Sequence, residues 1–144
     1  MDCSKLITTD DIASLCKSTR KLAAWTPDSD EGNVTEPTQS KTPCSRSVRI
    51  ESGEVFLHVQ VIDYGTSEAL ETLMSSEMNA YPTMFHDGLY IHEQHEAWWR
   101  RDVEYSNKGK LSVSVFETDQ PGHEALCSSE HLVDITRRMQ DRLP

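Results

Sequence analysis

The sequence contains little apolar material, few glycines and no long hydrophobic run. Apolar residues make up 36% of its 144 residues, whereas globular chains reach roughly 45–50% on a wider count that includes glycine. No apolar run approaches the roughly 20 residues that a membrane-spanning helix needs, so we expect no membrane span. The six glycines form no phosphate-cradling loop with a Walker lysine, and no G-x-S-x-G motif occurs. These absences argue against dinucleotide binding, phosphate binding and serine-hydrolase chemistry.

Positive charge is also scarce. Lys and Arg number 14 against 24 Asp and Glu, which gives a formal net charge of −10. A strong negative field opposes sequence-independent binding to nucleic acid and adsorption to an anionic membrane. It suits solubility or association with a basic protein partner. The length fits one domain over residues 1–144, which we expect to work without a cofactor, as a monomer or a small homo-oligomer.

Closely spaced cysteines are missing as well. None of Cys3, Cys16, Cys44 and Cys127 forms a CxxC motif, so the usual zinc-ligand pairing is absent. The wide spacing is compatible with two disulfides or with four buried thiols. We expect disulfides, because small domains with few apolar residues gain most from cross-links. Of the three possible pairings, we prefer Cys3–Cys44, which closes a polar loop, with Cys16–Cys127, which ties the first helix to the last.

The cysteines place the chain outside the cytoplasm, although no export signal is visible. The opening MDCSKLITTDD has no apolar segment of the kind a signal peptide requires. We therefore expect a mature fragment without its signal that is periplasmic, secreted or envelope-anchored. Cys3 could lie just behind a removed leader or a lipid anchor.

The first third of the chain predicts a helix, a long loop and a strand. The helix begins at Thr8 or Thr9, and Ile12, Leu15 and Cys16 share one face. Residues 26–43 contain three prolines and a single apolar residue, which predicts a long polar surface loop. A strand around 48–50 then leads to a hairpin turn at 51–54.

The rest of the chain predicts a hairpin-rich sheet with two further helices. Strands are expected at 55–62, 88–91, 97–105 and 111–116, with a turn at 106–109, and helices at 66–81 and 129–143. The apolar stripe of the last helix comprises Leu132, Ile135, Met139 and Leu143. The order α–ββ–α–βββ–α predicts an α+β fold, with an antiparallel sheet of about five strands and three helices.

Three histidines bring the sequence close to a metal motif. His92 and His95 are three residues apart in a segment that reads as strand or turn, whereas HExxH needs a spacing of four on a helix. His86 or Glu96 could complete a ligand set with them. We interpret these histidines as surface residues at a strand end, and keep them only as weak metal candidates.

A tryptophan–arginine cluster is the strongest indication of a partner-binding surface. The segment runs Trp98-Trp99-Arg100-Arg101, with Tyr90 nearby in sequence. Adjacent residues on a strand face opposite sides, so one tryptophan is expected in the core and the other is exposed or covered by the 26–43 loop. Exposed Trp, Tyr and Arg are favoured in protein interfaces, and we predict that these five residues bind a protein partner.

The opening segment, residues 2–12, reads DCSKLITTDDI and resembles the start of small bacterial exported domains, many of them lipoproteins of unknown function. Those domains open with a short helix, carry a second cysteine just before a sheet and end in a helix. Cys44-Ser45-Arg46, the 55–61 and 111–115 segments and the 135–143 helix are similar in order. The resemblance implies export, a Cys3–Cys44 disulfide and a non-enzymatic role, and it carries no catalytic residues. Cys16 and Cys127 go beyond the usual pair.

Three classes of function follow. We expect a non-catalytic extracytoplasmic binding domain for a protein or a cell-envelope component. A sharper version is an acidic immunity-type inhibitor that neutralises a basic toxin or enzyme, with the 26–43 loop or the 92–101 segment as its plug. The rival is a metal-dependent hydrolase that uses the histidine cluster. A small-molecule sensor would need an apolar pocket between helix and sheet.

Overall fold

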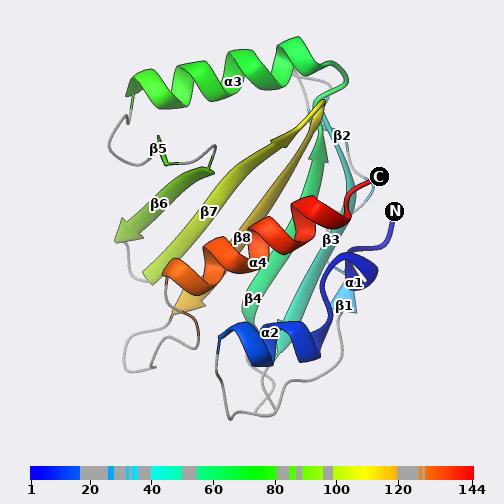
Figure 1. Ribbon diagram of the computed structural model, residues 1–144, viewed down its shortest axis with the longest axis vertical. Helices are drawn as coiled ribbons and strands as arrows, with labels where there is room; N and C mark the ends of the chain where they lie inside the picture. The colour runs from blue at the N-terminus through cyan, green and yellow to red at the C-terminus, as the bar shows by residue number, and fades with distance from the viewer. Residues whose placement is uncertain are drawn as a thin grey trace.

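The computed structural model describes residues 1–16, 26–27, 32, 34–35, 40–49, 55–80, 85–86, 89–95, 99–119, 127 and 129–144. In this part of the chain there are four helices and eight strands (Figure 1). The helices are α1 (Cys3–Leu6), α2 (Thr9–Leu15), α3 (Ser67–Ala80) and α4 (Ser129–Arg142). The strands are β1 (Thr26–Pro27), β2 (Val34–Thr35), β3 (Ser40–Arg49), β4 (Val55–Asp63), β5 (Phe85–His86), β6 (Leu89–His95), β7 (Trp99–Lys108) and β8 (Leu111–Asp119).

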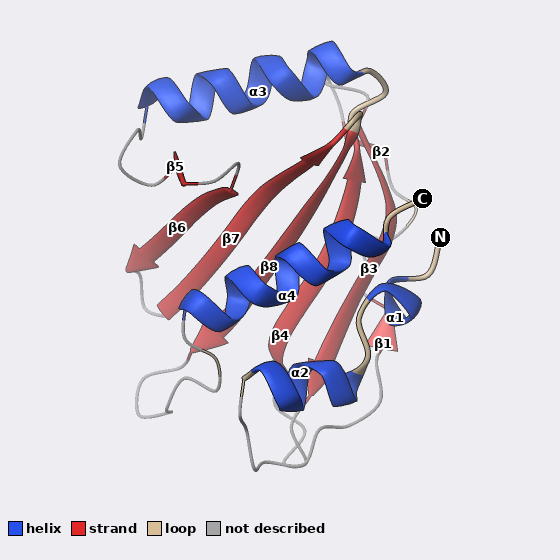
Figure 2. Cartoon of the chain, viewed as in Figure 1, coloured by secondary structure: helices blue, strands red, loops and turns tan. Residues whose placement is uncertain are grey.

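The strands form one antiparallel sheet. Its order is β1-β3-β4-β8-β7-β6-β5, and β2 also pairs with β3. Helices α1, α2 and α4 lie against one face of the sheet, and α3 crosses the end at which β4 finishes (Figures 1 and 2). None of the described helices is long and apolar enough to cross a membrane. Mixed helix and antiparallel sheet is the α+β architecture that the sequence predicts.

The core lies between α4 and the centre of the sheet. β4 and β8 contribute residues that are paired across the strands, Val59 with Val115 and Val61 with Val113, and all four side chains are fully buried. From α4 the core receives Leu132, Ile135 and Met139, which are 0% exposed, and Leu143, directly after the helix, is 4% exposed. The buried stripe of the last helix is therefore confirmed, residue by residue.

The N-terminal helical region differs from the prediction because it is divided in two. Asp2 caps the short helix α1 by accepting from the backbone N–H of Ser4, and the chain is extended at Ile7. Thr8 then starts α2 as predicted: its Oγ1 accepts from the Asp11 N–H, and the Asp11 carboxylate accepts from the Thr8 N–H, each at 3.0 Å. Such a reciprocal capping box stabilises a helix that is otherwise too short to persist alone.

Asp11 also links helix α2, near the N-terminus, to helix α4, near the C-terminus. Its Oδ1 lies 3.1 Å from Nη1 of Arg138, and its Oδ2 lies 2.7 Å from Nη1 of Arg142. Arg142 donates in addition to the backbone oxygen of Leu6 at 2.9 Å. The hydrogen bond from Arg142, followed by those from Thr8 and Arg138, holds the pKa of Asp11 well below its usual range, although partial burial opposes this. Helices α2 and α4 are thus linked by charge as well as by packing.

Replacing Asp11 with Asn should destabilise the fold by about 2 kcal/mol at pH 7, since charged hydrogen bonds are lost. A lowered native pKa means that the carboxylate stabilises the fold above the ordinary Asp value near pH 4, and that this contribution declines as the pH falls from there towards the native pKa. Urea unfolding of both proteins at pH 7 and pH 3 should show a smaller difference at pH 3. The exposed neighbour Asp10→Asn is the control. A difference that grows on acidification would contradict this assignment.

The prediction of a long surface loop at 26–43 is wrong for most of the residues of this segment that the structure describes. Its last residues, 40–43, already belong to β3, and two-residue strands at 26–27 and 34–35 pair with the outer edge of β3. Ser40 and Thr42 are buried, so this strand alternates small polar residues instead of large apolar ones. Hydrophobic periodicity cannot detect such a strand, which explains the error. The predicted turn at 51–54 lies outside the described residues.

The counts of five strands and three helices are also not confirmed. Within the described residues, the extra helix arises from the division at Ile7, and the extra strands are β1, β2 and β5, each of two residues. β7 continues to Lys108, so the expected turn at 106–109 is shorter: Gly109 adopts a φ of 65° and Lys108 pairs with Leu111. A left-handed glycine permits this tight connection.

Candidate functional site

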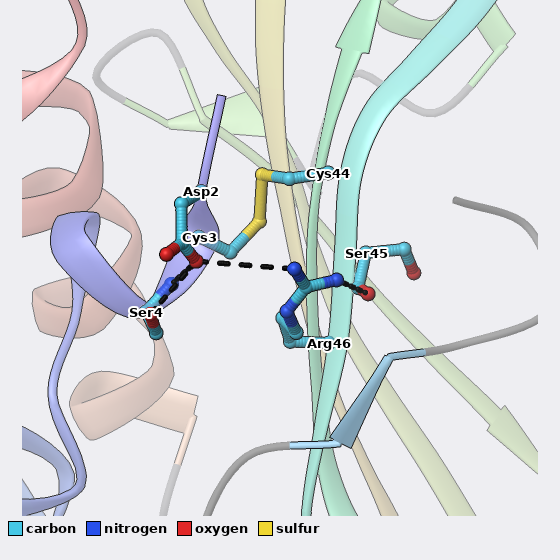
Figure 3. Close-up of a disulfide and its surroundings, with 6 residues drawn as sticks. All are labelled: Asp2, Cys3, Ser4, Cys44, Ser45 and Arg46. Carbon is cyan, nitrogen blue, oxygen red and sulfur yellow. Dashed lines mark hydrogen bonds and ion pairs between the residues drawn. A yellow bond between two sulfur atoms is a disulfide. The ribbon is translucent and has the colours of Figure 1, made fainter. Parts of the chain in front are cut away.

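Two disulfides fix the covered side of the sheet. Cys3 of α1 is bonded to Cys44 of β3 (Figure 3), and Cys16 at the end of α2 is bonded to Cys127, which precedes α4. All four cysteines are buried, with exposed fractions of 0–5%. These are the pairs that the sequence favours among the three connectivities. No free cysteine occurs in the described residues.

The Cys3–Cys44 bond lies beside a small polar cluster (Figure 3). The hydroxyl and the backbone N–H of Ser4 donate to Asp2, and these bonds, assisted by the charge of Arg46, lower the pKa of Asp2. Arg46 lies 3.9 Å from the Asp2 carboxylate and donates to the backbone oxygen of Ser45 at 3.1 Å. Every one of these groups has a partner, so the cluster holds the N-terminal segment on β3.

The structure divides the predicted tryptophan–arginine cluster. Trp98 lies outside the described residues, and the others are placed by the backbone of β6 and β7. Tyr90 pairs with Glu104, which pairs with Ser114 of β8, and Arg100 pairs with Thr118. In contrast, Arg101 pairs with Glu117, which pairs with Leu57 of the core. Trp99 pairs with His95 and Asp119.

The histidine candidates are not gathered by the backbone register. His92 pairs with Asp102 and His95 with Trp99 in β6, whereas His86 pairs with Leu89 from β5. Positions three apart on a strand belong to opposite faces of a sheet, so this register does not favour a shared metal site for His92 and His95. Glu96 lies outside the described residues. Where side chains are described, no group of three potential metal ligands occurs.

The face of the sheet opposite α4 is polar at its centre. Ser45 of β3, Gln60 of β4 and Ser114 of β8 are paired across three neighbouring strands. The adjacent positions pair Ser47 with His58 on one side and Ile62 with Ser112 on the other. We call these seven residues, Ser45, Ser47, His58, Gln60, Ile62, Ser112 and Ser114, the polar sheet face. The four serines are buried, whereas His58, Gln60 and Ile62 are half-buried.

Two hydroxyls of the polar sheet face are unsatisfied. The Oγ atoms of Ser112 and Ser114 are shielded from solvent, and neither has a hydrogen-bond partner among the described residues. The residues are 0% and 3% exposed. Elsewhere buried hydroxyls are paired: Ser47 Oγ lies 2.9 Å from Nδ1 of His58, and Thr136 Oγ1 donates to the Leu132 oxygen at 2.8 Å. Burying a hydroxyl without a partner costs about 1–3 kcal/mol, so native proteins rarely do it without a functional reason.

Sequence reasoning missed these serines because it placed them on the solvent side of a half-buried strand. Val113 and Val115 are fully buried, as the alternation predicts, but the serines between them are buried too. The available signal was the repetition of serine at alternate positions of two strands, at 45, 47, 112 and 114. Only the pairing of β3, β4 and β8 shows that these four residues lie on one face.

A small-molecule sensor would need an apolar pocket between helix and sheet, and the described residues under α4 do not form one. Leu132, Ile135 and Met139 pack there against the valines of β4 and β8, and all are fully buried. Side chains therefore fill the described contact between α4 and the sheet.

Comparison with known proteins finds one informative likeness. No family model and no curated protein matches the sequence. The chain is similar in structure to the extracellular domain of PknH from Mycobacterium tuberculosis, with a TM-score of 0.54 and 9% sequence identity, over 96% of this chain and 93% of that chain. At this identity the likeness concerns the fold alone. The two disulfides by themselves support a location outside the cytoplasm.

Proposed function

We propose that this chain is a single, non-catalytic extracytoplasmic binding domain. It recognises a component of the cell envelope through the polar sheet face. The observation that carries the proposal is the pair of buried hydroxyls on Ser112 and Ser114, which have no hydrogen-bond partner among the described residues. A bound polar ligand would satisfy them, and this is the simplest physical reason for retaining them. The extracellular character of the similar PknH domain supports the proposed compartment.

The predicted partner-binding residues extend this proposal to the β6–β7 side of the sheet. Tyr90 lies in a row of the polar sheet face, since it pairs with Glu104 and Glu104 pairs with Ser114, and Arg100 lies on the same side of β7 beyond these rows, where it pairs with Thr118. We propose that these two residues continue the recognition surface. Trp98, Trp99 and Arg101 are proposed contacts of a protein partner.

The proposed function is tested by co-sedimentation with purified insoluble cell walls of a mycobacterium. We expect the wild-type protein to sediment with the walls and Gln60→Arg to remain in the supernatant, because a long charged side chain at the centre of the face obstructs it. Ser14→Arg is the matched control: it adds the same charge on α2, on the covered side of the sheet, and should sediment like the wild type. Equal sedimentation of Gln60→Arg and wild type would overturn the assignment of this face.

A further inference from the structure

The polar sheet face carries hydrogen-bonding groups that are uncharged and mostly hydroxyls. Ser112 and Ser114 each offer one O–H donor and two acceptor lone pairs, and the Gln60 amide offers both donors and an acceptor. Such groups can meet a ligand hydroxyl in either direction. A ligand that itself carries many hydroxyls therefore matches this face better than one that only donates or only accepts.

Charge argues for a neutral ligand. None of the seven residues of the polar sheet face is Asp, Glu, Lys or Arg. A carboxylate, phosphate or ammonium group placed there would lose its hydration without gaining a counter-charge. The rows continue into β7 at Asp102 and Glu104, and the chain has a formal net charge of −10. Arg100 lies on the same side of β7 farther along the strand, but the acidic positions beside the face and the net charge of the chain disfavour anionic ligands at the face itself.

The dimensions of the face suit a short chain of sugar units. The step from β3 to β8 covers two inter-strand spacings, roughly 10 Å. From Ile62 to His58 the face extends four residues along β4, roughly 13 Å. We infer, on the basis of the proposed function, that the polar sheet face binds a neutral, hydroxyl-rich oligosaccharide whose hydroxyls pair with Ser112 and Ser114. Because both serine hydroxyls are shielded in the structure, binding requires a rearrangement of the side chains that cover them.

Calorimetric titration with cellotriose, maltotriose and triacetylchitotriose tests this inference, with trigalacturonate and the glucosamine trimer as acidic and basic counterparts. At least one neutral trimer should bind, and its binding should shift the backbone amide resonances of Ser112 and Ser114. The double variant Ser112→Ala/Ser114→Ala should bind at least tenfold more weakly, since two hydrogen bonds are removed. Its stability in urea should be unchanged or higher, because partnerless buried hydroxyls are removed. Ser14→Ala, an exposed serine on α2, is the control and should keep the wild-type affinity.

A purely structural role for the two serines predicts the opposite combination: lower stability and unchanged affinity. Binding of a charged trimer as strong as that of the neutral ones would overturn the inference, as would no binding of any neutral trimer at millimolar concentration. In either case the cell-wall experiment with Gln60→Arg shows whether the proposed function fails together with the oligosaccharide assignment. If sedimentation still depends on Gln60, only the oligosaccharide assignment fails; if it does not, the proposed function fails.

Discussion

Replacing Cys16 and Cys127 together by alanine should lower the free energy of unfolding by about 4–5 kcal/mol. The two cysteines are 111 residues apart, and the chain-entropy model assigns about this stabilisation to a cross-link that closes so long a loop. The bond also holds the end of α2 next to the start of α4. Urea unfolding under non-reducing conditions measures the change directly as a shift of the midpoint.

The matched variant is Cys3→Ala/Cys44→Ala. In the wild type, the bond between these two cysteines closes a shorter loop, with a separation of 41 residues. The same model therefore predicts a loss of stability that is smaller by about 0.9 kcal/mol. Both pairs are equally buried, which makes the comparison one of loop length. A loss below about 1 kcal/mol for the Cys16–Cys127 variant would show that the bond does not constrain the unfolded chain in this way.

The Ile135→Ala variant should cost about 3 kcal/mol, within the range measured for large-to-small changes in well-packed cores. Ile135 is fully buried in α4 and belongs to the central cluster between that helix and the sheet. Truncation removes apolar contacts and leaves a cavity that rigid strands on the other side cannot fill. Thermal or urea unfolding gives the value.

The neighbouring Asp134→Ala variant separates packing from helix propensity, because Asp134 is exposed on the same turn of α4. We expect it to change stability by no more than about 0.5 kcal/mol. If both variants cost the same, the assignment of Ile135 to the core would be wrong. Dichroism should show that both retain the helical and strand content of the wild type.

The best-predicted parts of the chain are those in which local chemistry and periodicity agree. Thr8 was expected as one of two starting residues for the first helix, and it is the N-cap. On β4 the expected alternation is confirmed: Leu57 and Val59 are fully buried and His58 is half-buried. Helix α3 begins after Thr66, whose Oγ1 accepts from the Ala69 N–H at 3.1 Å. Each of these features depends on residues a few positions apart.

The candidate site was not predictable in the same way, because it depends on residues from distant parts of the chain. Ser45 and Ser114 are separated by almost half of the sequence and lie in one row only because both pair with Gln60. The partner-binding prediction at Tyr90 and Arg100 named individual positions but not the rows of the sheet to which they belong. A hydroxyl that lacks a partner can be recognised only once every neighbour is known.

The sequence by itself determined which segments become helices and which become the main strands, since capping residues and apolar spacing act within one or two turns of chain. It also limited the cysteines to three pairings. Only the tertiary structure decided the pairing of residues 26–27 and 34–35 with β3, the link between Asp11 and the arginines of α4, and the burial of Ser112 and Ser114. The physical reason is that register and burial are set by contacts between strands and helices far apart in sequence, where small polar residues carry no hydrophobic signal of their own.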